Sequence, residues 1–443
     1  MIVSQAFKGK TYAVLGLARS GLATVDTLVA SGARVVAWDS REEARAAVAD
    51  KAELGDPMEI DLAGFDGIVV SPGVPLNKHP IAMRAKIAGV PIIGDIELFA
   101  LARPTLPPHK VVGITGTNGK STTTALIHHI IEQAGFPARM GGNIGLPILG
   151  QQPLEPNLHG MGVYVLELSS YQIDLTHSLD CDVAVLLNIT PDHLDRYNGF
   201  AGYVASKARL FAMQSAEHVA IFAADDESTR AIAAVEWQRR GHKPKWGVVH
   251  AADIDPEAQL GWPSLQGPHN AQNAAVAIAV GRALDIDDAT IMAALASYAS
   301  LPHRMQAVGT HNGVLYVNDS KATNAASTAP ALGAWPARDG KPRIHWILGG
   351  VAKSDNLDEC APYYGNIAHA YTIGEAGHMF ADLLRPHMAV DDSEMLSAAV
   401  RRAARIAQPG DVVLLSPACA SFDQFRDFEA RGDAFAAAVN ALE

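Results

Sequence analysis

The chain has 443 residues, 49% of them apolar and 19% charged, which is enough for about three domains with buried cores and excludes a disordered protein. Its 47 Asp and Glu exceed its 35 Lys and Arg, and the formal net charge of −12 argues against a nucleic-acid or membrane-surface binder. Three scattered cysteines exclude a disulfide framework. With no secretory leader and no apolar stretch of about 18 residues, the sequence predicts a soluble cytoplasmic protein that does not insert into membranes.

Short runs of Val, Ile and Leu alternate with Ala-rich helical patterns from one end of the chain to the other. This alternation is typical of βαβ units, so we predict α/β domains with parallel sheets. The expected strands lie at 12–15, 34–38, 68–70, 91–93, 110–114, 164–167, 183–187, 219–222, 315–317, 344–348 and 412–415.

Two joints divide this pattern into three parts. Three prolines between residues 103 and 108 favour an extended linker over a helix or a central strand. A second joint lies near 301–304, after a long helix expected over 269–284. We therefore predict domains at 1–106, 107–302 and 303–443.

The strongest local motif is Gly116-Thr117-Asn118-Gly119-Lys120-Ser121-Thr122, between an expected strand and an expected helix. Glycines let successive backbone N–H groups and the helix N-terminus point at a phosphate. Lys120 would neutralise the terminal phosphates, and a hydroxyl of Ser121 or Thr122 would reach Mg²⁺. Ile114 stands where the G-x-x-x-x-G-K-[ST] pattern has its first glycine, but the placement still favours a phosphate-binding loop over an ordinary glycine-rich turn.

A candidate metal site follows two later strands. Glu167 ends one expected strand, and His193 lies in the loop after the next. Because carboxyl ends of parallel strands form the ligand crevice, both side chains could meet Mg²⁺ beside the phosphates. Singly, Glu167 reads as a helix cap or a solvated acid and His193 as a loop histidine, but their shared placement favours the metal. Lys207, on the next expected helix, reads by itself as a solvated surface charge.

Both outer domains also carry polar loops at strand ends. The turn 16–21, followed by Asp39, is an imperfect dinucleotide fingerprint in which Ala18 replaces the middle glycine. This imperfect match is weak evidence that the turn binds NAD, and a different nucleotide diphosphate remains a possible ligand. In the last third, three polar segments follow expected strands and predict a binding site, at 318–324, at Lys353 and at 416–425.

Together these motifs resemble those of the Mur ligase family of ATP-dependent amide-bond-forming enzymes, and the resemblance covers essentially the whole chain. The glycine turn, Asp192-His193-Leu194-Asp195-Arg196-Tyr197 and His303-Arg304-Met305 are similar to family-wide motifs. Residues 318–324 and 416–425 resemble those of the member that adds D-glutamate. The resemblance implies a Rossmann-like N-terminal domain, a central P-loop ATPase-like domain with a mostly parallel sheet, and a Rossmann-like C-terminal domain.

The resemblance also implies a reaction. ATP would convert the carboxylate of UDP-N-acetylmuramoyl-L-alanine into an acyl phosphate, D-glutamate would attack it, and ADP and phosphate would leave. This would be a cytoplasmic step of peptidoglycan precursor synthesis, carried out by a monomer with two Mg²⁺ ions. The implied metal ligands are Ser121, Glu167, His193 and a carbamate on Lys207. ATP would also contact Asn270, Arg304 and Asp319. The UDP substrate would contact Arg19, Ser20, Asp39, Ser40, Arg41, Gly73, Asn143 and His193. D-glutamate would contact Lys321, Thr323, Lys353, Ser421 and Phe422.

Other functions remain as alternatives. A sister ligase that adds another amino acid, or a folylpolyglutamate-type ligase, would share the central domain. The imperfect N-terminal turn and the second phosphate loop disfavour an NAD-dependent oxidoreductase. A non-catalytic nucleotide sensor is disfavoured because Lys120, Glu167, His193 and Arg304 are all present.

Overall fold

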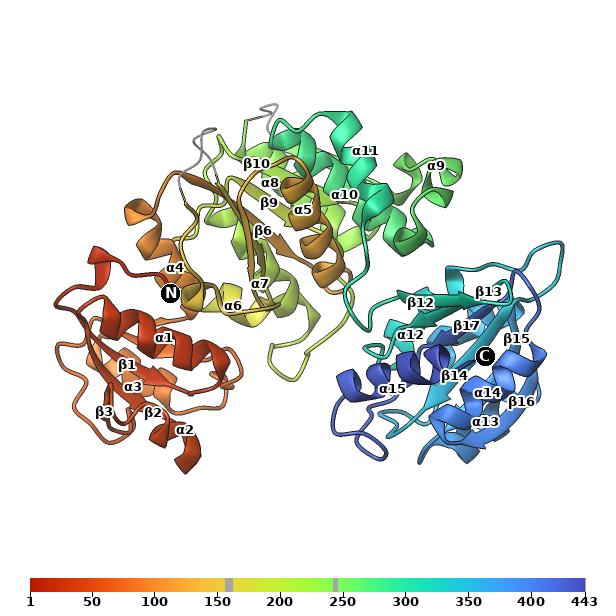
Figure 1. Ribbon diagram of the computed structural model, residues 1–443. Helices are drawn as coiled ribbons and strands as arrows, with labels where there is room; N and C mark the ends of the chain where they lie inside the picture. The colour runs from red at the N-terminus through yellow and green to blue at the C-terminus, as the bar shows by residue number, and fades with distance from the viewer. Residues whose placement is uncertain (156–161, 242–245, 443) are drawn as a thin grey trace. The chain divides into compact units, whose positions relative to one another are not determined.

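The computed structural model describes residues 1–155, 162–241 and 246–442. Its named strands form three separate, mostly parallel sheets with helices packed beside them, which confirms the predicted α/β class (Figure 1). None of the described helices is long and apolar enough to cross a membrane. The chain forms two compact units, one of Met1–His250 with Ala275–Ala294 and one of Ala251–Ala274 with Leu295–Glu443.

The first sheet has the strand order β3-β2-β1-β4-β5, and all of its strands are parallel. Its central strands form at the predicted apolar runs because side chains on both faces are buried, Val14 on one and Ala13 on the other. The elements are β1 (Thr11–Leu15), α1 (Arg19–Ala30), β2 (Arg34–Trp38), α2 (Glu42–Ala46), β3 (Glu53–Leu54), β4 (Gly67–Val70), α3 (Ile81–Ala88), β5 (Ile92–Ile93) and α4 (Asp95–Ala102).

The segment after α4 differs from the extended linker predicted at 103–108. Residues Arg103–Thr105 form a short 3-10 helix, so the prediction is wrong for them. The physical reason is that Pro104 lies in the first turn, where its missing N–H removes no helical hydrogen bond. Leu106 is extended, and β6 begins three residues later.

The second sheet is parallel throughout, in the order β11-β10-β9-β6-β8-β7. Its central strand, β6 (His109–Thr115), lies between β8 (Gly162–Glu167) and β9 (Val183–Leu186). The chain therefore leaves β6 at a point where the strand order reverses, which is where open parallel sheets bind ligands. The other elements are α5 (Lys120–Gln133), β7 (Ala138–Gly142), α6 (Ser170–Asp174), α7 (Phe200–Ala212), β10 (Val219–Ala223), α8 (Glu227–Arg239), β11 (Trp246–Val249), α9 (Pro256–Leu260), α10 (Pro268–Ala283) and α11 (Asp288–Ser297).

The first two sheets share one apolar core. Val25 and Leu28 of α1 belong to the same buried cluster as Leu149 and Tyr164 of the second sheet's region. The Leu149 carbonyl also accepts hydrogen bonds from the Ile2 N–H, at 2.8 Å, and the Thr27 hydroxyl, at 3.0 Å. On the side where α1 lies, the two sheets are therefore joined by packed apolar side chains.

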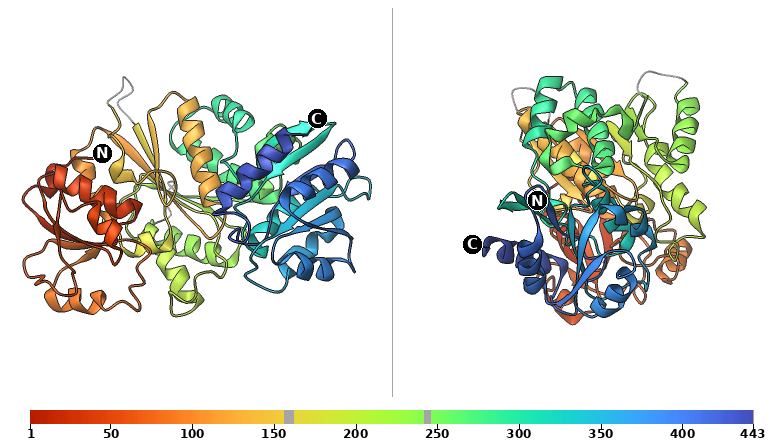
Figure 2. Two further views of the ribbon diagram at one scale, coloured as in Figure 1. Left: turned by 60° about the horizontal axis from the view of Figure 1, so that its bottom comes forward. Right: turned by 90° about the vertical axis from the view of Figure 1, so that its right-hand side faces the viewer.

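The third sheet has the order β12-β13-β17-β14-β15-β16, with only the β12–β13 pair antiparallel. Buried clusters cover both faces, with Trp346 on one and Ile347 on the other. Figure 2 shows the flanking helices of this sheet from two further directions. The elements are β12 (Gln306–His311), β13 (Val314–Asn318), α12 (Ala325–Gly333), β14 (Ile344–Gly349), β15 (Ile367–Ile373), α13 (Gly377–Leu384), β16 (Ala389–Glu394), α14 (Leu396–Ile406), β17 (Val412–Leu415) and α15 (Phe428–Asn440).

Candidate active site

The predicted phosphate loop connects β6 to α5. Gly116 has φ +155° and Gly119 has φ +81°, backbone conformations that side chains rarely allow. Ile114, in the place of the missing glycine, is fully buried within β6 and so belongs to the sheet rather than to the turn. The Lys120 ammonium donates to the carbonyls of Gly116 at 3.0 Å and Thr117 at 2.8 Å, which places the cation inside the loop.

The loop is also held from the neighbouring strand β9. The Asn188 side chain accepts from the Asn118 N–H at 2.9 Å and donates to the Asn118 carbonyl at 3.2 Å. The Thr190 N–H donates to the Thr117 hydroxyl at 3.0 Å. Asn188 is therefore a candidate site residue that was not predicted from the sequence, although its place at a strand end beside the glycine turn was a usable signal.

Glu167 is buried at the end of β8, with 2% of its surface exposed. Its Oε1 accepts from the Asn143 side-chain amide at 3.0 Å, whereas its Oε2 is buried and has no hydrogen-bond partner among the described residues. The reading of Glu167 as a cap or a solvated acid is therefore wrong, and Ser169 caps α6 instead. A buried carboxylate oxygen without a donor fits a divalent cation, because oxygen ligands are those that Mg²⁺ prefers.

Lys207 of α7 points into the protein, with 1% of its surface exposed. Its ammonium donates to the Gly116 carbonyl at 2.7 Å and lies 4.7 Å from the centre of the Tyr203 ring. The surface-charge reading of Lys207 is thus wrong. Burial, and then the charge of Lys120, lower the pKa of Lys207 well below its ordinary value.

His193 is more exposed than the other predicted metal ligands. It lies in the loop between β9 and α7 with φ +51°, and 49% of its side chain is exposed. Its ring lies 5.1 Å from the Tyr171 ring, and its Nε2 is 3.5 Å from an Asp192 oxygen. Within the described part of the chain, no three His, Cys, Asp or Glu side chains cluster as a metal cage. One carboxylate, a hydroxyl from Ser121 and substrate phosphates still form a donor set that suits Mg²⁺.

Six of the predicted UDP-binding residues follow β1, β2 and β4, which are adjacent in the first sheet, whereas Asn143 and His193 follow β7 and β9 of the second sheet. Asp39 accepts from the N–H groups of Leu17 at 2.7 Å and Arg41 at 3.0 Å. Burial alone would raise the pKa of Asp39, but hydrogen bonds from Arg41 and Leu17 outweigh it and lower that pKa to about 2. The same edge carries Arg19, Ser20, Ser40 and Gly73.

Ala18 does not disturb the N-terminal turn. Its φ of −74° and ψ of −173° are ordinary extended values, so the backbone there needs no glycine. By contrast, a Cβ on Gly21 would lie 2.0 Å from the Gly16 carbonyl oxygen, so this close approach does require glycine. The turn thus keeps the two glycines on which its geometry depends.

In the second unit, Asp319 lies just beyond the end of β13 and is 7% exposed. It accepts from the Ser416 hydroxyl at 2.8 Å and the Met305 N–H at 3.2 Å. Burial raises the pKa of Asp319 to about 7, although these hydrogen bonds and the charge of Arg304 lower it in part. Asn270, near the start of α10, is buried, and its side-chain amide donates a hydrogen bond to the Gln266 carbonyl.

The predicted D-glutamate residues lie on loops after β13, β14 and β17, which are neighbours in the third sheet. The Lys353 ammonium donates to the Thr323 hydroxyl at 3.3 Å. Val351 and Ala420 form paired backbone hydrogen bonds of 2.9 Å, which bring the Lys353 loop beside the loop of Ser421. Lys321 lies 4.0 Å above the Phe428 ring, Ser421 is buried, and Phe422 is 73% exposed.

Arg431, which was not predicted from the sequence, lies beneath these loops with 1% of its surface exposed. It donates to the hydroxyl of Ser320 at 3.0 Å and to the Ser320 carbonyl at 2.9 Å. Burial lowers its pKa to about 10. It holds the base of segment 318–324, and nothing in its local sequence indicates a buried guanidinium.

Comparisons with known proteins cover nearly the whole chain. Family models described as "Mur ligase MurD-like, N-terminal domain", "Mur ligase middle domain" and "Mur ligase, glutamate ligase domain" match residues 10–94, 114–281 and 303–419. Relatives named UDP-N-acetylmuramoylalanine--D-glutamate ligase, from Novosphingobium aromaticivorans and Sphingopyxis alaskensis, are 65% and 62% identical over 100% of this chain and 97% and 100% of theirs.

Solved structures share the fold at much lower identity. The structure of UDP-N-acetylmuramoylalanyl-D-glutamyl-2,6-diaminopimelate--D-alanyl-D-alanyl ligase from Acinetobacter baumannii matches with TM-score 0.58 at 15% identity, over 99% of this chain and 92% of that one. UDP-N-acetylmuramate-alanine ligase from Thermotoga maritima matches with TM-score 0.55 at 15% identity, over 98% and 99%.

Proposed function

Since the chain belongs to the Mur ligase family, we propose that it joins D-glutamate to UDP-N-acetylmuramoyl-L-alanine in the cytoplasm, converting ATP to ADP and phosphate. The observation that carries this proposal is the grouping at the ends of β6 and β8. There, Lys120 lies in a phosphate-type loop, and Glu167 on the adjacent strand presents a buried oxygen that accepts from no donor in the described part of the chain.

The first step would activate the substrate carboxylate. A carboxylate is a poor acyl donor because its oxygen is a poor leaving group, so transfer of the γ-phosphoryl group makes an acyl phosphate. Lys120 and the N-terminus of α5 stabilise the charge on the transferring oxygens. When bound, two Mg²⁺ ions held by Ser121, Glu167, His193 and modified Lys207 would add positive charge at the phosphates.

The second step would form the amide bond. The amine of D-glutamate attacks the acyl phosphate, and the tetrahedral intermediate collapses as phosphate leaves. Lys321 and Lys353 supply the positive charge that the two carboxylates of D-glutamate need, and Thr323 and Ser421 supply hydroxyls. Asn143, bonded to Glu167, would orient the muramoyl end of the other substrate.

We also propose that Lys207 carries a carbamate. A neutral amine adds to CO₂ to form an N–C bond and releases one proton, and the buried site of Lys207 favours the neutral amine. The product is an anion, whose oxygens suit Mg²⁺ better than an ammonium does.

The proposed reaction is tested by incubating the protein with ATP, Mg²⁺ and UDP-N-acetylmuramoyl-L-alanine, with and without D-glutamate. We expect phosphate release that depends on both substrates, and a product heavier than the UDP substrate by one glutamate residue. Competing amino acids, including L-lysine and meso-diaminopimelate, should not replace D-glutamate. Preferred use of another amino acid would indicate a sister ligase.

A further inference from the structure

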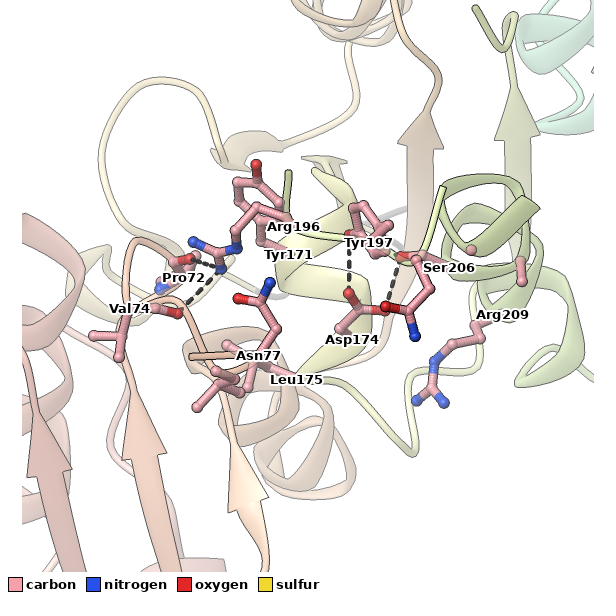
Figure 3. Close-up of a pocket in the computed structure, with 14 residues that line it drawn as sticks. Pro72, Val74, Asn77, Tyr171, Asp174, Leu175, Arg196, Tyr197, Ser206 and Arg209 are labelled. Carbon is pink, nitrogen blue, oxygen red and sulfur yellow. Dashed lines mark hydrogen bonds between the residues drawn. The ribbon is translucent and has the colours of Figure 1, made fainter. Parts of the chain in front are cut away.

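A polar clasp joins the loop after β4 to the loop that carries His193. The Arg196 guanidinium donates to three successive carbonyls of the first loop, Pro72 at 3.3 Å, Gly73 at 3.3 Å and Val74 at 3.0 Å. The Asn77 side-chain amide donates in the other direction, to the Asp195 carbonyl at 3.2 Å. Figure 3 shows the Arg196 contacts to Pro72 and Val74.

Arg196 is fixed from the second sheet's side as well. Its guanidinium lies 4.1 Å from the centre of the Tyr171 ring, and Tyr171 belongs to α6, which starts three residues after Glu167. The next residue, Tyr197, donates its hydroxyl to Asp174 of the same helix at 2.9 Å. A planar guanidinium with five donors can stack on a ring and bridge several carbonyls at once, which an ammonium cannot do.

The clasp spans a hollow rather than a packed interface. A cavity of about 510 Å³ lies beside it, lined by the loop after β4, by α6 and by α7 (Figure 3). On the α1 side, the same two sheets are joined by apolar packing around Leu149. Beside this cavity, the Gly94 N–H also donates to the Leu175 carbonyl at 2.9 Å, but the direct contacts between the two loops themselves are the hydrogen bonds of Arg196 and Asn77.

Both clasped loops carry residues of the proposed site. Gly73 belongs to the loop expected to contact the UDP substrate, and His193 belongs to the loop expected to hold Mg²⁺. The Arg196 N–H donates to the His193 carbonyl at 3.0 Å, so displacement of Arg196 displaces His193 with it. His193 is half exposed, and its ring lies against Tyr171 and near Asp192, which belong to the same side of the clasp.

We infer that Arg196 is a positioning residue that couples binding of the UDP substrate to the placement of His193 at the magnesium site. A substrate that orders the loop of residues 72–74 would, through the guanidinium, order His193 for the metal. By linkage, Mg²⁺ with nucleotide would then tighten binding of the UDP substrate by the same factor. This inference rests on the proposed function.

The test measures Kd for UDP-N-acetylmuramoyl-L-alanine by calorimetry, with and without Mg²⁺ and a non-hydrolysable ATP analogue. For the natural protein, we expect Kd to fall at least about fivefold when both are added. The quantity compared is the Kd ratio, which is Kd without Mg²⁺ and the analogue divided by Kd with both. For Arg196→Ala and Arg196→Lys, this ratio should fall to about one, because neither side chain bridges the three carbonyls. Arg209→Ala is the matched control, because Arg209 lines the same cavity but donates to Thr176 on its own side. It should keep the natural ratio.

Folding of each variant is checked by thermal melting followed by circular dichroism. If Arg196→Ala does not fold, Arg196→Lys and Asn77→Ala decide the question. For Asn77→Ala, the Kd ratio should lie between one and the natural value. A ratio in folded Arg196 variants within twofold of the natural one overturns the inference, as does a natural ratio near one in a protein that makes product. Absence of product from the natural protein would instead overturn the proposed function.

Discussion

The residues proposed to act on phosphate, in the first unit, and those proposed to bind the amino acid, in the second unit, lie in different surroundings. In the first unit, Glu167 and Lys207 are 2% and 1% exposed and lie against the ends of central strands. In the second unit, Lys353 and Phe422 are exposed on loops, and Lys353 has one 3.3 Å contact, to Thr323. Glu167 and Lys207, which are expected to act at the phosphates, are thus fixed by the core, whereas Lys353 and Phe422, which are expected to select the amino acid, lie on an exposed rim.

This difference predicts which residues should determine the rate of phosphoryl transfer and which should determine the selectivity for the amino acid. Charge develops on phosphoryl oxygens in the transition state, so the groups that stabilise it must be in place beforehand. A small amino acid needs few contacts, which loops can supply. We therefore expect substitutions on the phosphate side to lower kcat, and substitutions on the rim to raise the KM for D-glutamate.

The largest effect is expected from Lys120→Ala. Loss of the cation inside the phosphate loop should lower kcat by about a hundred- to a thousandfold, the size seen for loss of one oxyanion donor. Phosphate release at saturating substrates measures this. Lys110→Ala, at the other end of β6, is the control and should keep its rate. Activity of Lys120→Ala within threefold of the natural protein would refute the phosphate-loop assignment.

Lys207→Ala should follow, with kcat lowered by about a hundredfold through loss of a metal ligand. Added acetate should restore part of the rate by filling the vacated ligand position. Lys207→Arg should stay inactive with acetate, because a guanidinium keeps its charge and occupies the space. Full activity of either variant would leave Lys207 without a metal role and weaken the contrast between the two sides.

Lys353→Ala tests the rim. Loss of one charge-assisted hydrogen bond should raise the KM for D-glutamate about tenfold and leave the KM for ATP unchanged. Initial rates over a series of D-glutamate and ATP concentrations separate the two constants. Lys341→Ala, another exposed lysine of the same unit, should change neither. A selective loss of ATP affinity in Lys353→Ala would reverse the proposed roles of the two units.

The smallest effect is expected from Phe422→Ala. Because this ring is 73% exposed, its removal should change the free energy of unfolding by less than about 0.5 kcal/mol and raise the KM for D-glutamate about threefold. Phe425 packs partly against the core, so Phe425→Ala should lower the free energy of unfolding by about 2 kcal/mol. Thermal melting compares the two, and equal losses would contradict the description of Phe422 as a rim residue.

Most of the sheet structure could be predicted, because the central strands are runs of Val, Ile and Leu buried on both faces. Two of the strands that were not predicted, β7 and β16, lack that signal. β7 reads Ala-Arg-Met-Gly-Gly and β16 reads Ala-Val-Asp-Asp-Ser-Glu, so their pairing is decided by neighbouring strands rather than by their own residues.

The sequence motifs indicate which residues form the candidate site but say less about the surroundings of those residues. Burial of Lys207 had a readable signal, since Tyr203, Lys207, Leu210 and Phe211 share one face of α7 at helical spacing. The Arg196 contacts had none, because they join residues more than 120 positions apart. Such contacts depend on how two domains pack, which no local pattern encodes.

The exposed loops over the third sheet also bear on how this chain can evolve. Exchange of a solvent-facing side chain there changes stability little, so it keeps the protein above the threshold for folding. Arg431 holds the base of one loop from below and leaves its outer positions free to vary. A change of accepted amino acid could therefore arise by single substitutions on the rim, while the buried residues proposed to act on phosphate are inherited unchanged.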